Sequence, residues 1–157
     1  MEKVKLQAQY GLYINGQWRD ASDGATYNAE SPADGSHLAV CAQGSREDVE
    51  AASAAAWEAF KTWKKTTPAQ RAALLNKIAD IIDANKEHLA MVESMDNGKP
   101  IRETMNVDIP MAAEHFRYFA GCILAEEGQA SVLNEQFLSI IPVSYTHLRA
   151  HETRRHL

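Results

Sequence analysis

The chain has 157 residues, a net charge of −5 and an ordinary globular composition, with 45% hydrophobic and 24% charged residues. This length suits a single domain, and the negative charge gives no basis for nucleic acid or an anionic membrane as a partner. No run of about 18 apolar residues could span a membrane, and the polar start is unlike a secretory signal. The two cysteines, Cys41 and Cys122, are expected to be free thiols in a reducing cytoplasm.

Two short β-hairpins are predicted near the N-terminus, after a polar segment, residues 1–10, that is predicted to be disordered. The dipeptide Asn15-Gly16 is a strong turn signal and predicts strands near 11–14 and 17–20. A second pair, 26–30 and 37–42, flanks a Pro-Ala-Asp-Gly turn.

The first long helix is predicted over residues 46–63. Ser45 can cap it, and Asp48 suits both the capping box and the positive helix start. One face of this helix repeats apolar residues, which predicts close packing on a neighbour that the sequence does not identify; its members are Val49, Ala52, Ala56, Phe60 and Trp63.

A second helix is predicted to run unbroken from Pro68 to Asn97, with Thr67 as its cap, and would be about 45 Å long at 1.5 Å per residue. Gly98 fits the positive φ of a helix end, and Lys99 can reach the last free carbonyls. Asp96 does not suit this position, because a carboxylate in the last turn lies at the negative end of the helix dipole.

A third helical region is predicted as a short helix near 100–106 and a second one from 109 to about 126, capped by Asp108, with Pro110 in its first turn. Gly128 is the expected stop, and residues 137–141 are predicted to form a strand. The expected buried stripe of this helix consists of Ala112, Phe116, Phe119 and Ile123. The fold class is therefore α+β, mostly helical with N-terminal β-hairpins.

Three residue patterns could carry chemistry, but simpler interpretations are favoured for each. Cys41 has no neighbouring base in the sequence and is predicted to be a small packed hydrophobe rather than a nucleophile. His115 is predicted to be a packed or surface histidine. His147 and His151 have the spacing of a helical zinc pair, yet no third or fourth ligand is evident.

The composition changes in residues 142–157, which hold three arginines, three histidines and only one acid, Glu152. A basic nucleic-acid arm would be small on so acidic a protein. The string resembles the conceptual translation of a sequencing-library adapter, so we expect a non-native, disordered tail.

The motif Met95-Asp96-Asn97-Gly98-Lys99-Pro100, followed by residues 115–121, His-Phe-Arg-Tyr-Phe-Ala-Gly, resembles the amino-terminal region of the NAD(P)-dependent aldehyde dehydrogenases. The resemblance runs from about Tyr13 to Ile141 and includes the Tyr-Ile-Asn-Gly-Gln-Trp hairpin. It is most similar to bacterial enzymes acting on acetaldehyde-like short aliphatic aldehydes. It implies that residues 11–141 are an incomplete piece of the family's α/β Rossmann-like cofactor-binding domain.

The family oxidises an aldehyde to a carboxylic acid with NAD or NADP and forms homo-oligomers, and its assembly segment begins near residue 137. Its nucleophilic Cys, base Glu, Pro-Trp-Asn-Phe and Lys-Pro-Ser motifs all lie beyond the part that corresponds to Ile141. The resemblance therefore implies no catalytic and no cofactor-binding residue in this chain, which is expected to be inactive and to bind no NAD. The glycines also form no phosphate-binding loop.

One family site falls within this sequence. Several members bind a monovalent cation through an aspartate matching Asp96 and backbone carbonyls matching Ala29 and Glu30. A bound cation would offset the unfavourable dipole at Asp96, whereas a solvated carboxylate is the alternative. For the whole chain, the alternatives are a non-catalytic helical assembly or adaptor protein derived from the family, and a free-standing helical protein with no enzyme kin.

Overall fold

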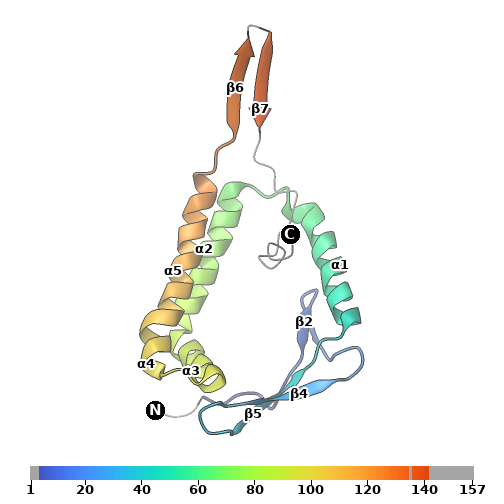
Figure 1. The fold of residues 1–157 in the computed structure, drawn as a ribbon, viewed down its shortest axis with the longest axis vertical. Helices are drawn as coiled ribbons and strands as arrows, with labels where there is room; N and C mark the ends of the chain where they lie inside the picture. Colours follow the sequence, from blue (N-terminus) through green and yellow to red (C-terminus); the bar gives the residue numbers. More distant parts are fainter. Residues whose placement is uncertain (1–3, 135, 142–157) are drawn as a thin grey trace.

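The computed structural model describes residues 4–134 and 136–141, in which short strands come first, helices follow and a β-hairpin comes last (Figure 1). The predicted α+β class, mostly helical with N-terminal hairpins, is confirmed. The tail, with His147 and His151, lies outside the described residues.

The first hairpin consists of β2 (Leu12–Ile14) and β3 (Gln17–Arg19), paired antiparallel with Tyr13 opposite Trp18. Asn15 and Gly16 both have positive φ, 52° and 77°, which a two-residue hairpin turn of this type requires. The hairpin predicted from Asn15-Gly16 is thus confirmed, and the bounds of each strand agree with the prediction to within one residue.

A separate three-stranded sheet has the order β1-β5-β4, in which β4 (Thr26–Glu30) runs antiparallel to β5 (His37–Ala42). Both strands have the predicted bounds. The short strand β1 (Gln9–Tyr10) pairs parallel with β5, so the prediction of disorder through residue 10 is wrong at these two residues. Parallel pairing with a strand about 30 residues away leaves no local sequence signal.

Helix α1 (Arg46–Trp63) has the predicted bounds and the predicted capping box between Ser45 and Asp48. Its predicted apolar face, however, packs on no other helix in the part of the chain that the structure describes. Val49 is 65% exposed and Trp63 43% exposed. Figure 1 shows α1 standing apart from the other helices, near β2.

The predicted single helix from 68 to 97 is wrong, because two helices occupy this segment: α2 (Pro68–Ala84) and α3 (Lys86–Asn97). The break falls at Asn85, with φ −112° and ψ 16°. Its side-chain Nδ2 donates to the Ile81 carbonyl at 2.8 Å, to which its backbone N–H also donates. An asparagine amide competes in this way with the helical hydrogen-bond ladder, and the two helices can then take different directions.

The third helical region is continuous. Helix α4 (Ile101–Glu103) passes into a π-helical turn, η1 (Thr104–Asp108), and then into α5 (Ile109–Leu124). The prediction that Asp108 caps α5 is wrong, because Asp108 has helical φ and ψ and makes no cap bond. The Ile109 N–H donates to Thr104 O, five residues back. The wider turn makes room for the Pro110 ring, which would otherwise crowd the preceding turn.

Helices α2 and α5 run side by side in opposite directions (Figure 1) and form the main helix–helix contact. Alanines spaced seven apart are buried on both helices, Ala72 with Ala79 and Ala113 with Ala120. The predicted stripe of α5 is therefore wrong in part, because Phe119 is 58% exposed. Small residues at the contact let the two helix axes approach closely.

Every apolar side chain that is buried in the described residues is an alanine. Large apolar side chains remain partly or largely exposed, on α1, α5 and the last hairpin. Helix backbones therefore approach closely in this structure, but few large apolar side chains are buried. Burial of such side chains is the main source of hydrophobic stability.

The last hairpin pairs β6 (Gln129–Asn134) with β7 (Phe137–Ile141) and extends away from the helices (Figure 1). Strand β7 has the predicted bounds, whereas β6 was not predicted, because glutamine, alanine and serine favour strands weakly. Helix α5 ends at Leu124, so Gly128 is not its stop. If α5 continued to Gly128, the acids Glu126 and Glu127 would lie at the negative end of the helix dipole, which is unfavourable. The described residues contain no helix long and apolar enough to cross a membrane.

Candidate functional site

The most specific part of the sequence, Asn97 to Pro100, forms the turn that ends α3. Gly98 has φ 75°, and its N–H donates to Ser94 O at 3.1 Å. The Ser94 hydroxyl donates to the Lys99 carbonyl at 2.6 Å, and the Lys99 N–H donates to Asn97 Oδ1 at 2.8 Å. This turn is thus fixed by side chains of its own residues, as a left-handed glycine cap allows.

The prediction that the Lys99 side chain reaches the last free carbonyls of the helix is wrong. Lys99 Nζ donates to Asp108 on η1, and this hydrogen bond raises the pKa of the Lys99 amine above its ordinary value. The pair connects the α3 turn to the π-helical turn. Thr104, fully buried at the start of the same π-helical turn, donates its hydroxyl to Ala90 O of α3 at 2.9 Å. Together these bonds hold α3 against η1.

The same turn lies against the connection between β4 and β5. A Cβ placed on Gly98 would be 2.9 Å from Pro32 Cγ and 3.9 Å from Ala33 N. Since real Cβ atoms do not approach so closely, a glycine is required here for both its φ and its contact.

The predicted cation ligands come from these two segments. Asp96 is exposed two residues before Gly98, and its charge is a minor cause, after the hydrogen bond to Cys41, of the raised pKa of Tyr27 on β4. Ala29 and Glu30 follow on the same strand, at a register shift in its pairing with β5. The contact between Gly98 and Pro32 therefore brings the end of α3 to the segment that follows β4, and the ligand role of Asp96, Ala29 and Glu30 stays a prediction. Among residues 4–134 and 136–141, no group of three His, Cys, Asp or Glu could hold a metal ion.

The candidate nucleophiles and bases do not meet. Cys41 is half-buried on β5, opposite Tyr27, and the Tyr27–Cys41 hydrogen bond raises the pKa of the Tyr27 hydroxyl. Cys122 is exposed on α5, where its hydrogen bond with Tyr118 raises the pKa of that hydroxyl. His115 is exposed, as predicted. None of these groups forms a nucleophile–base pair.

The most highly bonded side chain is Asp48, which is 2% exposed. Its carboxylate accepts from the backbone N–H groups of Ser22 and Ser45, each at 3.0 Å, and from Arg19 Nη2 at 2.9 Å. The two backbone bonds are the main cause that lowers the Asp48 pKa to about 2. The sequence predicted the capping role from Ser45, but not the bonds to Arg19, at the end of the hairpin, and to Ser22, in the turn that follows it. These bonds fix α1 to the hairpin.

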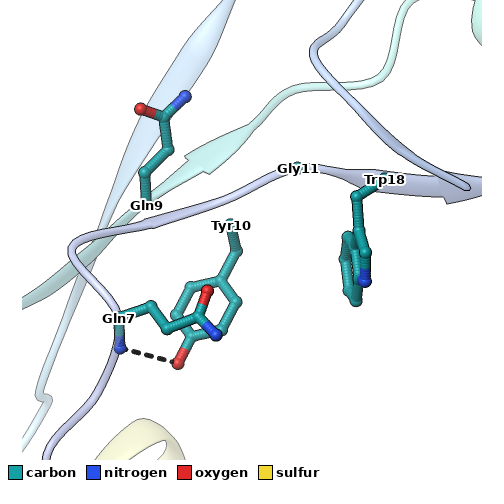
Figure 2. A pocket seen from close by; sticks show the side chains of 5 residues that line it. All are labelled: Gln7, Gln9, Tyr10, Gly11 and Trp18. Carbon is teal, nitrogen blue, oxygen red and sulfur yellow. Dashed lines mark hydrogen bonds between the residues drawn. The ribbon is translucent and has the colours of Figure 1, made fainter.

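A shallow hollow of about 370 Å³ lies beside β1 and is lined by Gln7, Gln9, Tyr10, Gly11 and Trp18. Figure 2 shows the Tyr10 and Trp18 rings on one side of the chain and Gln9 directed away from them. The Tyr10 hydroxyl accepts from the Gln7 N–H at 3.1 Å. Its lining contains the Tyr10 hydroxyl but no carboxylate, histidine, lysine or thiol.

Comparison with known sequences gives a consistent result. A family model described as "Aldehyde dehydrogenase family" matches residues 18–145. A long-chain-aldehyde dehydrogenase of an Acinetobacter species is 46% identical over 137 residues, which are 87% of this chain and 27% of that protein. An acetaldehyde dehydrogenase of Pseudomonas aeruginosa is 44% identical over 132 residues, 84% of this chain and 26% of the relative.

Solved structures agree. The fold matches PnpE in complex with nicotinamide adenine dinucleotide, with a TM-score of 0.81 and 40% identity over 84% of this chain and 27% of PnpE. It matches an NAD-dependent aldehyde dehydrogenase from Sinorhizobium meliloti with a TM-score of 0.81 and 33% identity over 87% and 28% of the two proteins. The chain thus spans about 27% of the length of curated relatives that it matches.

Proposed function

We propose that this chain, which belongs to the aldehyde dehydrogenase family, is the amino-terminal segment of an enzyme that oxidises aldehydes to carboxylic acids with a nicotinamide cofactor. The observation that carries the proposal is the match over residues 18–145, with 46% identity to a named relative. Relatives named for long-chain aldehydes and for acetaldehyde both favour an aliphatic substrate. We propose a short aliphatic aldehyde, and NAD rather than NADP because two similar structures hold NAD. The proposed location is the cytoplasm.

The segment is proposed to be inactive by itself. Aldehyde oxidation needs a reactive thiolate, donors for the oxyanion, a base for water and a hydride acceptor, which the cofactor supplies when bound. In the described residues, Cys41 and Cys122 form side-chain hydrogen bonds with the hydroxyls of Tyr27 and Tyr118, whose pKa values are raised by these bonds, and not with a histidine or a carboxylate. The segment's own contribution is structural, because α2, α5 and the Gly98 turn form a scaffold for later parts of the enzyme.

The starts of α1, α2 and α5 fit a cofactor poorly, whereas α3 begins after Asn85 without a side-chain cap. Pyrophosphate binds at a helix N-terminus with free N–H groups. The start of α1 already holds the Asp48 carboxylate, α2 is capped by Thr67 and Gln70, and α5 continues from η1 without a free end. We expect the 157-residue protein to bind no NAD, because the family's cofactor-holding Lys-Pro-Ser motif lies beyond the part that corresponds to Ile141.

The test compares two proteins. The source DNA is read across codon 141, and the protein encoded by the continuing frame is assayed for aldehyde-dependent reduction of NAD beside the 157-residue protein. We expect activity only in the longer protein. A frame that ends with the present tail would refute the proposal and favour the adaptor alternative, and activity in the 157-residue protein would refute its inactivity.

A second part of the proposal is a monovalent cation held by Asp96 and the backbone carbonyls of Ala29 and Glu30. It is supported by the Gly98 turn lying against Pro32, which brings the end of α3 to the segment that follows β4. The Asp96 charge also adds slightly, after the hydrogen bond to Cys41, to the raised pKa of Tyr27 on β4. A cation would compensate the carboxylate at the negative end of α3. Its role would be to fix the end of α3 on β4.

The cation is tested by the melting temperature of the protein in sodium or potassium chloride against tetramethylammonium chloride at equal ionic strength. A ligand that binds only the folded state raises the melting temperature with its concentration. Asp96→Asn should abolish the difference, whereas Glu87→Gln, which removes another exposed carboxylate of α3, should retain it. An equal response of Asp96→Asn and the unaltered protein would contradict the site.

The third part is self-association of the longer enzyme through the β6–β7 hairpin. Both strands carry exposed apolar side chains, among them Val132 at 77% and Ile140 at 64%. Such surfaces are usually covered by another subunit or domain. In the longer enzyme, Ile140→Lys should reduce the mass measured by light scattering, whereas Ser139→Lys at the neighbouring half-buried position provides the comparison. An unchanged mass for Ile140→Lys would contradict this interface.

A further inference from the structure

The sequence contains two Asn-Gly dipeptides, Asn15-Gly16 and Asn97-Gly98, and the structure places them in opposite environments. In such a pair, the glycine backbone nitrogen can attack the asparagine Cγ. A bond forms between these two atoms, the bond from Cγ to the amide Nδ2 breaks, and ammonia leaves. Water then opens the resulting succinimide to aspartate or isoaspartate. The reaction needs only water, an accessible asparagine side chain and a glycine N–H that is not held elsewhere.

At Asn97-Gly98 every one of these groups is held. The Gly98 nitrogen donates its proton to Ser94 O at 3.1 Å. Asn97 Oδ1 accepts from the Lys99 N–H at 2.8 Å, and Asn97 Nδ2 donates to Glu93 Oε1 at 3.4 Å. Gly98 is also packed against Pro32. Attack requires that the end of α3 unfold first.

At Asn15-Gly16 the same groups are open. Asn15 is exposed, and its side chain makes no hydrogen bond with the residues that the structure describes. The Gly16 N–H donates to none of them either, and nothing lies within 4 Å of the position of a Gly16 Cβ. The turn closes a two-stranded sheet with three residues in each strand. A two-stranded hairpin is marginally stable, so the turn can open to the reactive geometry at low cost.

We propose that Asn15 is a site of spontaneous deamidation in the folded protein and that Asn97 is protected from the same reaction. The product at Asn15 is a mixture of aspartate and isoaspartate, each of which adds one negative charge. Isoaspartate also adds an atom to the backbone within a two-residue turn, which the pairing of Ile14 with Gln17 cannot accommodate unchanged. Ageing would therefore loosen β2 from β3.

The test follows both sites in one digest of the 157-residue protein. Trypsin releases Asn15 within the peptide 6–19 and Asn97 within the peptide 87–102, and each peptide holds a single asparagine. After incubation in mildly alkaline buffer, mass spectrometry measures the deamidated fraction of each, and a parallel sample in concentrated urea provides the unfolded rates. Asn15→Gly keeps a Gly-Gly turn without the reactive side chain and serves as the control for changes elsewhere.

In buffer we expect Asn15 to deamidate about tenfold or more faster than Asn97, a ratio equivalent to about 1.4 kcal/mol of opening free energy. In urea the two rates should converge, because both asparagines precede glycine. Equal rates in buffer would overturn the proposal. The proposal would also be overturned if folding, in comparison with urea, slowed deamidation at Asn15 as much as it slowed deamidation at Asn97.

Discussion

At the scale of single residues, Asp48 caps one element and attaches it to another. Its carboxylate closes the first turn of α1 through Ser45 and also accepts from Ser22 and Arg19 of the preceding segment. Because the hydrogen bonds from Ser22 and Ser45 stabilise the charged carboxylate, folding lowers the Asp48 pKa from its ordinary value of 3.8 to about 2.

Asp48→Asn should lower stability at neutral pH, since an amide accepts fewer hydrogen bonds than a carboxylate. For a carboxylate whose folded pKa is lowered, stability is gained above the unfolded pKa and lost as the pH falls through the folded one. The difference in urea midpoint between wild type and variant should therefore be constant above about pH 4 and shrink toward pH 2. Glu50→Gln, at an exposed position of α1, is the control, and a difference independent of pH would count against the assignment.

Gly98 combines two requirements, a left-handed φ and contact with Pro32, whereas Gly16 has only the first. Gly16→Ala should cost about 1 kcal/mol from backbone strain. Gly98→Ala should cost about 2–3 kcal/mol, because the added methyl also meets Pro32. Urea unfolding of the two variants compares them directly. Equal losses would mean that the α3 turn does not press on the β4–β5 connection.

At the scale of elements, the α2–α5 pair depends on alanines rather than on the phenylalanines of α5. Ala79 is fully buried at this contact, and Ala73, on the same helix, is exposed. Ala79→Leu should destabilise by about 2–3 kcal/mol, because its side chain would separate two close helices. Ala73→Leu should change stability by less than about 0.5 kcal/mol. Thermal unfolding followed by helical circular dichroism measures both, and a tolerated leucine at 79 would contradict the close packing.

At the scale of the whole molecule, the segment leaves many large apolar side chains in contact with water. Trp57, Phe119, Leu124 and Val132 are each more than half exposed. The isolated protein is expected to bind a hydrophobic dye such as ANS and to associate as its concentration rises. Sedimentation velocity and dye fluorescence measure these properties. A monodisperse monomer with a sharp, cooperative melt and no dye binding would contradict this expectation.

Much of the local structure could be predicted from the sequence because its causes lie within a few residues. The Asn-Gly turn, the capping boxes at Ser45 and Thr67 and the left-handed Gly98 all involve bonds between near neighbours. The family also followed from short motifs, since a run such as residues 95–100 is specific as a string. The contact between Gly98 and Pro32 brings the end of α3 to the segment that follows β4, but coordination of a cation by the predicted residues stays a proposal.

Only the tertiary structure decided the features that depend on distant partners. Helix α3 packs on η1, and Asp108 of the π-helical turn pairs with Lys99 at the end of α3. Alanines rather than Phe119 are buried on α5 because α2 approaches closely. The strands β1 and β6 form by pairing with β5 and β7. The sequence determined local hydrogen bonds and turns. Packing between distant segments determined which helix faces are covered and which segments lie side by side, because those free energies arise only when the segments meet.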